Sequence, residues 1–309
     1  MRPEIYPERQ RVSPLRKPLL LILLLTPAAV TSPALGADDT TTKTAESATV
    51  FVPPDEASIP DNAFGDMVKL GRKIFTDTEH SASEYTGNQL NCSNCHLDAG
   101  RRADSAPLWA AWVKYPAYRG KNQMVNTMEE RIQGCFRYSM NGTPPPADSD
   151  VLKSLMTYSY WMAKGAPTGA DMPGRGYPAP GQPASPPSFK RGRQVFEQHC
   201  AVCHGDNGEG TRVNNQTVFP PLWGSQSYNW GAGMHRINTA AAFIRANMPL
   251  GQGGTLSEQQ AWDVAYFINS HERPQDPRFD GHVKQTDNAF HQHQCRYGDK
   301  VDGHILGDQ

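Results

Sequence analysis

Cys92-Ser93-Asn94-Cys95-His96 and Cys200-Ala201-Val202-Cys203-His204 are two copies of one pattern, Cys-x-x-Cys-His, in a chain of 309 residues. The pattern is typical of c-type haem attachment. Two thiols at this spacing add to the two vinyl groups of one porphyrin, and the adjacent histidine becomes the proximal iron ligand. A single copy can arise by chance, but two copies favour haem over disulfides or zinc. The sequence therefore predicts two covalently attached haem c groups, with His96 and His204 as proximal ligands.

The segments around the two motifs repeat each other. A Gly-Arg-x-x-Phe run precedes each motif, at 71–75 and 192–196, and Pro-Leu-Trp follows each, at 107–109 and 221–223. Apolar residues at helical spacing lie before each motif, and an aromatic-rich helical pattern closes each unit. This layout predicts an all-α fold of two class I cytochrome c-like domains, in which the first and last helices pack across the haem. We expect the proline of each Pro-Leu-Trp run to direct its carbonyl toward the proximal histidine.

The N-terminus has the features of a cleaved signal peptide over residues 1–36. A basic stretch ends at Lys17, an apolar run covers 19–25, and small residues continue to Gly36. The apolar run is too short to span a bilayer, which takes about 20 residues. We therefore expect a soluble protein exported to the periplasm, without a membrane span. The net charge of −1 gives no indication of nucleic-acid binding.

Composition predicts the remaining domain boundaries. The N-terminal cytochrome c domain is expected at 37–164 and the C-terminal one at 189–275. Glycine and proline dominate residues 165–188, which indicates a linker. Residues 276–309 form a polar tail.

The tail contains four histidines and a cysteine without an assigned role. The histidines have no recognisable metal-ligand spacing, so we expect them to be exposed to solvent; they are His282, His291, His293 and His304. Cys295 is expected to be a free thiol, and a disulfide to Cys135 is the alternative.

Distal iron ligands can be sought at equal spacing in the two domains. Met248 and Met140 each lie 44 residues after the histidine of their motif (248 − 204 and 140 − 96). A thioether ligand raises the haem potential, which suits electron exit at Met248. Near Met140, however, Cys135 stands in a segment, 101–140, with seven basic and three acidic residues, and cationic surroundings favour a thiolate. From the residues alone, both Cys135 and Met140 remain candidates for the first haem.

Longer stretches resemble a known family. "CSNCHLDAGRRADSAPLW" at 92–109, "YRGKNQMVNTMEERIQGCFRYSMNG" at 118–142, "ANMPLG" at 246–251 and "HERPQDPRF" at 271–279 are similar to the dihaem thiosulfate dehydrogenases of the TsdA type. The resemblance implies that His96 and Cys135 ligate a catalytic haem, with Met140 as the alternative to Cys135. It places Arg131 and Ser139 in the active site and suggests Arg119 or Lys121 as a further anion contact.

The resemblance also implies an activity. Two thiosulfate ions are oxidised to tetrathionate, or tetrathionate is reduced in reverse, and electrons pass through the second haem to a soluble cytochrome c or a high-potential iron–sulfur protein. Cationic side chains such as Arg131 would offset the repulsion between two dianions. Some members have a lysine before the distal methionine and exchange the two ligands, whereas this chain has Asn247. The main alternative is a dihaem electron carrier without substrate chemistry; a dihaem peroxidase and a SoxA-like cytochrome that acts on a carrier protein are two others.

Overall fold

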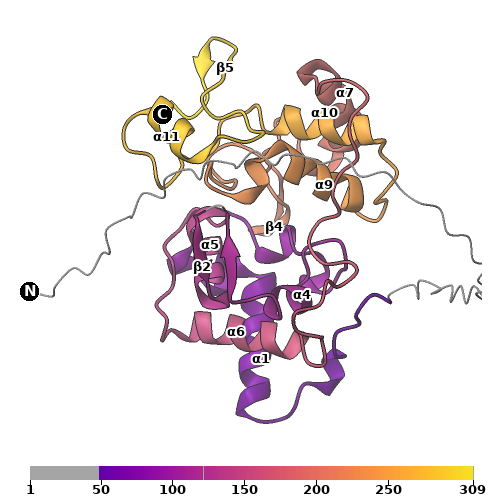
Figure 1. Ribbon diagram of the computed structural model, residues 1–309, viewed down its shortest axis with the longest axis vertical. Helices are drawn as coiled ribbons and strands as arrows, with labels where there is room; N and C mark the ends of the chain where they lie inside the picture. The colour runs from indigo at the N-terminus through magenta and orange to yellow at the C-terminus, as the bar shows by residue number, and fades with distance from the viewer. Residues whose placement is uncertain (1–48, 121, 309) are drawn as a thin grey trace, which may run out of the picture. The chain divides into compact units, whose positions relative to one another are not determined.

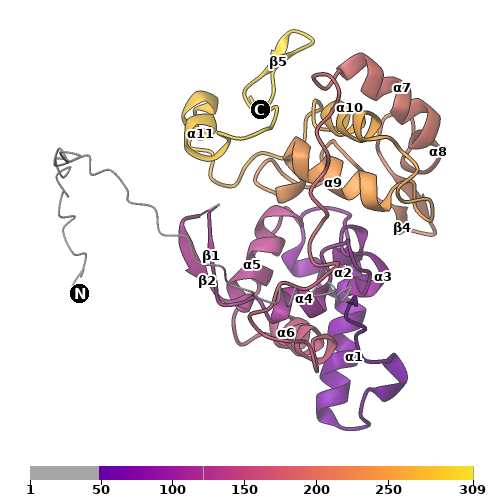
Figure 2. The same ribbon diagram turned by 45° about the vertical axis from the view of Figure 1, so that its right-hand side comes forward.

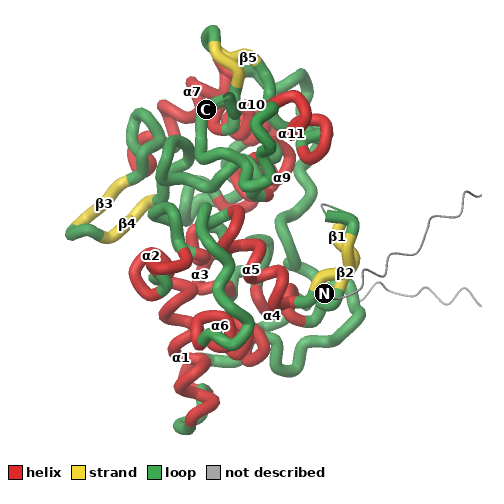
Figure 3. The backbone as a smooth tube through the Cα atoms, turned by 90° about the vertical axis from the view of Figure 1, so that its left-hand side faces the viewer, coloured by secondary structure: helices red, strands yellow, loops and turns green. Residues whose placement is uncertain are grey.

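The computed structural model describes residues 49–120 and 122–308, so the predicted signal peptide and Lys121 lie outside the described residues. The fold is mostly helical, with three two-stranded antiparallel hairpins (Figure 3). None of the helices in the described ranges combines the length and apolar character that a bilayer span requires.

The elements fall into three groups along the chain. The first group is η1 (Glu56–Ser58), α1 (Ala63–Thr76), α2 (Thr78–Ser81), η2 (Ser83–Tyr85), η3 (Cys92–Asn94), α3 (Leu97–Gly100), α4 (Leu108–Trp112), β1 (Ala117–Arg119), β2 (Met124–Asn126), α5 (Met128–Tyr138) and α6 (Asp150–Met162). The second is α7 (Phe189–His199), α8 (Ala201–His204), β3 (Thr211–Val213), β4 (Gln216–Phe219), η4 (Gly233–His235), α9 (Ile237–Asn247) and α10 (Glu258–Ile268). The last is α11 (Val283–Phe290), β5 (Lys300–Val301) and β6 (His304–Ile305). Residues 165–188 form neither helix nor strand.

In the first domain α1 packs against α6 (Figure 1). The side chain of Asn62 caps α1 by accepting from the Gly65 N–H at 3.1 Å. The two helices meet at Gly71, where a Cβ would lie 2.1 Å from the carbonyl oxygen of Ser154. Only a glycine permits such close backbone contact, so Gly71 sets the distance between the helices.

The second domain repeats this arrangement with α7 and α10 (Figure 2). A Cβ at Gly192 would lie 2.0 Å from the carbonyl oxygen of Asp263. Phe75 and Phe196, which end the repeated Gly-Arg-x-x-Phe runs, are buried in the cores of their domains. The repeat therefore encodes one helix crossing twice, and the prediction of two cytochrome c-like domains is confirmed.

Asparagine side chains connect the end of α5 to the second domain. The Asn88 amide donates to the carbonyl oxygens of Ser139, at 2.8 Å, and Ser227, at 3.0 Å. The Asn229 amide donates to the carbonyl oxygen of Arg137 at 2.9 Å. These bonds fix the end of the helix that carries Cys135.

The tail is only partly exposed, which differs from the prediction that all its histidines are exposed to solvent. His282 and His304 are exposed, but His293 is partly buried and only 2% of His291 is accessible. His291 stacks on Tyr297, with ring centroids 4.1 Å apart. The prediction of a solvated tail is therefore wrong at His291, because the tail folds back and buries this ring.

Candidate active site

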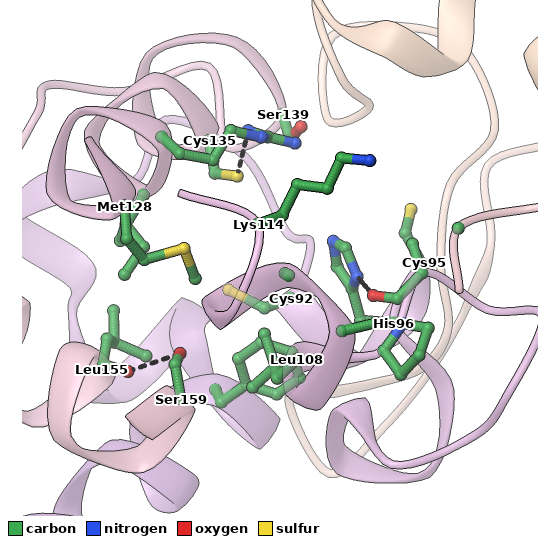
Figure 4. A pocket seen from close by; sticks show the side chains of 18 of the residues that line it. Cys92, Cys95, His96, Leu108, Lys114, Met128, Cys135, Ser139, Leu155 and Ser159 are labelled. Atoms are coloured by element: carbon green, nitrogen blue, oxygen red, sulfur yellow. Dashed lines mark hydrogen bonds between the residues drawn. The ribbon is translucent and has the colours of Figure 1, made fainter. Parts of the chain in front are cut away.

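A cavity of about 490 Å³ lies in the first domain, within the range of about 300–1,000 Å³ usual for cofactor sites. It is lined by α4, α5 and α6 together with both cysteines of the first attachment motif. Figure 4 shows His96 and Cys135 projecting into it from different walls. The cavity thus brings together Cys92, Cys95, His96 and Cys135, as the sequence predicts.

His96 is oriented as a ligand. Its Nδ1 donates to the Ala106 carbonyl oxygen at 2.6 Å, so its Nε2 is the nitrogen that can bind iron. Burial lowers the pKa of His96 to about 4, so the ring is neutral at pH 7, which is the form that binds a metal. The prediction that the Pro107 carbonyl oxygen accepts from His96 is wrong. The acceptor is the carbonyl oxygen of the preceding residue, Ala106.

Cys135 is paired with Arg131 on one face of α5. The helix begins with a capping box, in which Thr127 accepts from the Glu130 N–H and Glu130 accepts from the Thr127 N–H. Residues four apart in a helix share a face, and Arg131 Nη1 donates to Cys135 Sγ at 2.8 Å. Negative charge at Cys135 raises the pKa of Arg131. A guanidinium in this position compensates the charge of a thiolate.

Met140 also lines the cavity and is 2% exposed. Met128, at the start of α5, also lines the cavity and is a third candidate for the distal sulfur, one that the sequence pattern did not indicate. Both methionines are largely buried, whereas the sulfur of Cys135 is in contact with a cation. Cys135 is therefore distinguished from the two methionines by its neighbouring cation. Met140 lies at the same cavity and remains the alternative iron ligand.

Positively charged side chains gather at the same cavity. Arg119 and Ser139, both predicted from the sequence, line it together with Arg131, while Lys121 lies outside the described residues. Lys114 and Arg175 line it as well, and Figure 4 shows the Lys114 side chain inside it. The excess of basic residues in segment 101–140 could have indicated that Lys114 contributes to this site.

Arg175 and Tyr177 are two further functional candidates that sequence reasoning missed. Both belong to the Gly/Pro-rich stretch whose composition predicts a linker. Tyr177 donates its hydroxyl to the Cys95 carbonyl oxygen at 3.1 Å, so this stretch forms a wall of the cavity.

The second attachment motif has similar local geometry. His204 Nδ1 donates to the Pro220 carbonyl oxygen at 2.8 Å, again one residue before Pro-Leu-Trp. Burial lowers the pKa of His204. Met248 follows α9 directly and packs with Cys200 against the core of the second domain. Cys203 completes the motif, and its carbonyl oxygen accepts from the Thr211 hydroxyl at 2.7 Å.

Asn247 is almost fully buried, with 2% exposed. Its amide donates to the carbonyl oxygens of Asp104, at 2.9 Å, and Phe243, at 3.2 Å. The Asn247 side chain therefore forms hydrogen bonds with the main chain of each domain.

The donor set at the first site suits a covalently attached haem. All six cysteines are free, which leaves both motif thiols available and excludes the alternative disulfide between Cys135 and Cys295 in this structure. The remaining lining is largely apolar and includes Phe75, Leu90, Leu108, Ile132 and Leu155. Two thiols, an oriented imidazole and a further sulfur around one apolar cavity are the groups that a haem c needs.

Comparison with known proteins identifies relatives along most of the chain. Residues 79–168 match the family model described as SoxA/TsdA, cytochrome c domain, and residues 189–272 match the model for cytochrome c. The thiosulfate dehydrogenase of Stutzerimonas stutzeri is 56% identical over 260 residues, which cover 83% of this chain and 85% of that protein. That of Thiomonas intermedia is 57% identical over 259 residues, with coverages of 84% and 82%.

A solved structure is also similar. The thiosulfate dehydrogenase TsdBA of Marichromatium purpuratum, in its as-isolated form, matches with a TM-score of 0.82 and 54% identity over 84% of this chain. The present chain spans 58% of the length of that solved chain.

Proposed function

Because the chain belongs to the thiosulfate dehydrogenase family, we propose that it oxidises two thiosulfate ions to one tetrathionate in its first domain. One sulfur–sulfur bond forms between the terminal sulfurs of the two ions, and two electrons leave. The contact of 2.8 Å between Arg131 and Cys135, inside a cavity with several cations, is the observation that supports this proposal best.

Cytochrome c domains bind haem c covalently, and we propose one haem in each domain. Cys92 and Cys95 would attach the first, with His96 and Cys135 as iron ligands. Cys200 and Cys203 would attach the second, with His204 and Met248 as ligands. The bound haems supply acceptors for one electron at a time.

The cationic lining suits the first cavity to the binding of anions. Two dianions repel each other strongly in a site of low dielectric constant, so positive side chains are needed beside them. Arg131 and Arg119 line the cavity, and Ser139 contributes a hydroxyl donor. Lys121, outside the described residues, remains a proposed anion contact.

We further propose that the protein works in the periplasm and passes electrons to a soluble acceptor. A soluble cytochrome c or a high-potential iron–sulfur protein would accept them from the second haem. Since neither proposed ligand set needs to change during transfer, the reverse reaction, tetrathionate reduction, is also expected.

The Cys135→Ala variant tests the proposal. Cys135 lies outside both attachment motifs, so the variant should keep two covalently bound haems by pyridine haemochrome assay and lose thiosulfate oxidation. Electron paramagnetic resonance of the oxidised protein should show a thiolate-ligated low-spin haem in the wild type and none in the variant. Near-normal turnover in the variant would contradict the role of Cys135. A protein that exchanges electrons with a soluble cytochrome but consumes no thiosulfate would instead be an electron carrier.

A further inference from the structure

Four metal-binding side chains meet away from both attachment motifs. His235, in η4, lies beside His291, His293 and Cys295 of the tail, and their ligand atoms are all within 4.8 Å of one another. We call these four residues the tail cluster. His235 is completely buried and 2% of His291 is exposed.

Two histidines of the tail cluster are oriented by hydrogen bonds of the kind that metal ligands make. His235 Nδ1 donates to the Ala232 carbonyl oxygen, so its Nε2 faces the cluster. His291 Nε2 donates to the Asp276 carboxylate at 3.0 Å, so its Nδ1 faces the cluster. A metal-ligating histidine almost always donates its other N–H to a carbonyl or carboxylate in this way.

The separations between the ligand atoms are close to those of a small tetrahedral site. His235 Nε2 lies 2.8 Å from His293 Nε2, and His291 Nδ1 lies 3.8 Å from Cys295 Sγ. In a tetrahedral zinc site, with bonds of about 2.0 to 2.3 Å, neighbouring ligand atoms are roughly 3.3 to 3.6 Å apart. The two imidazole nitrogens are closer than this range, at hydrogen-bond distance, and the His291–Cys295 pair is slightly wider. Small side-chain rotations that replace the hydrogen bond by two bonds to the ion would complete the site.

The backbone already holds the tail segment beside η4. The Ile237 N–H donates to the Gln294 carbonyl oxygen at 2.9 Å. Gln294 stands between His293 and Cys295, two residues of the tail cluster. The Asp276 carboxylate is in turn bound by the Arg278 guanidinium at 2.6 and 2.9 Å. The orienting carboxylate is thus fixed from a second side.

We propose that His235, His291, His293 and Cys295 bind one zinc ion, which fastens the tail to the second domain. Imidazole nitrogen and thiolate sulfur are both zinc ligands, and four of them fill the four positions of a closed tetrahedral site. When the ion binds, the Cys295 thiol releases its proton to solvent. The site shares no ligand with the two proposed haem sites.

Metal analysis of the holoprotein tests this proposal. After dialysis against a chelator, the wild type is titrated with Zn²⁺ alone, and zinc and iron are measured together by mass spectrometry. With two haem irons per chain as internal standard, we expect one zinc for every two irons. Zinc should also raise the Tm, because an ion that binds only the folded chain stabilises it.

Variants locate the ion. Cys295→Ser and His293→Ala should each weaken zinc binding by at least about tenfold. His282→Ala and His304→Ala are matched controls, because both histidines are exposed tail residues outside the cluster, and they should bind zinc like the wild type. If one cluster variant fails to fold, the other decides. Absence of zinc binding in the wild type, or binding unchanged by both cluster variants, would overturn the proposal.

Discussion

Arg131→Ala should impair the use of thiosulfate much more than it affects folding. The guanidinium lies 2.8 Å from Cys135 Sγ and lines the cavity, so its removal takes away a charge-assisted contact at a partly desolvated position. Loss of such a contact costs about 2 to 4 kcal/mol of transition-state stabilisation. At about 1.36 kcal/mol for each factor of ten, kcat/KM should fall about 30- to 900-fold.

The assay is steady-state thiosulfate oxidation with an artificial electron acceptor, accompanied by thermal unfolding and haem content. Arg131→Lys keeps the charge but loses the planar fork, so it should recover part of the activity. Arg137→Ala is the matched control, because Arg137 is an exposed arginine on the same helix. An unchanged kcat/KM in Arg131→Ala, or an equal loss in Arg137→Ala, would refute the reasoning.

Two further predictions concern packing and ligand choice. Gly71→Ala and Gly192→Ala should each lower the free energy of unfolding by about 1 to 3 kcal/mol, because the added Cβ would meet a backbone carbonyl of the facing helix. Gly134→Ala is the control for chemical denaturation, since Gly134 is also helical and a Cβ there meets nothing within 4 Å; equal losses at all three positions would contradict the crossing argument. Met140→Leu should keep most thiosulfate oxidation, and loss of a methionine-to-iron signal in this variant would show that Met140, rather than Cys135, is the ligand.

Features encoded by local spacing could be predicted from the sequence. The attachment motifs need only five consecutive residues each, and Arg131 and Cys135 share a helix face because they are four positions apart. The repeated glycines, Gly71 and Gly192, were visible as a pattern. Their role at the helix crossings became clear only from the facing carbonyl oxygens.

Features that depend on long-range contacts could not be predicted in this way. Arg175 reaches the cavity because a stretch without secondary structure passes beside Cys95, and Gly/Pro-rich composition does not specify such a path. The tail cluster joins His235 to residues more than fifty positions later, so no ligand spacing was visible in the sequence. Tertiary folding, rather than local pattern, brings these groups together.

Asn247 provides a last prediction, which concerns the direction of catalysis. Its buried amide donates to the carbonyl oxygens of Asp104 and Phe243, so it is held by the backbone and offers no strong iron ligand. We therefore expect the second haem to keep His204 and Met248 in both oxidation states, and tetrathionate reduction to be measurable alongside thiosulfate oxidation. Redox titrations followed through the weak near-infrared band of methionine-bound ferric haem should coincide in the oxidative and reductive directions. Asn247→Lys places an amine beside Met248, as in the family members that exchange ligands, and should introduce hysteresis. Hysteresis already present in the wild type would show that another residue replaces Met248 on oxidation and that the expectation of an ungated, reversible enzyme is wrong.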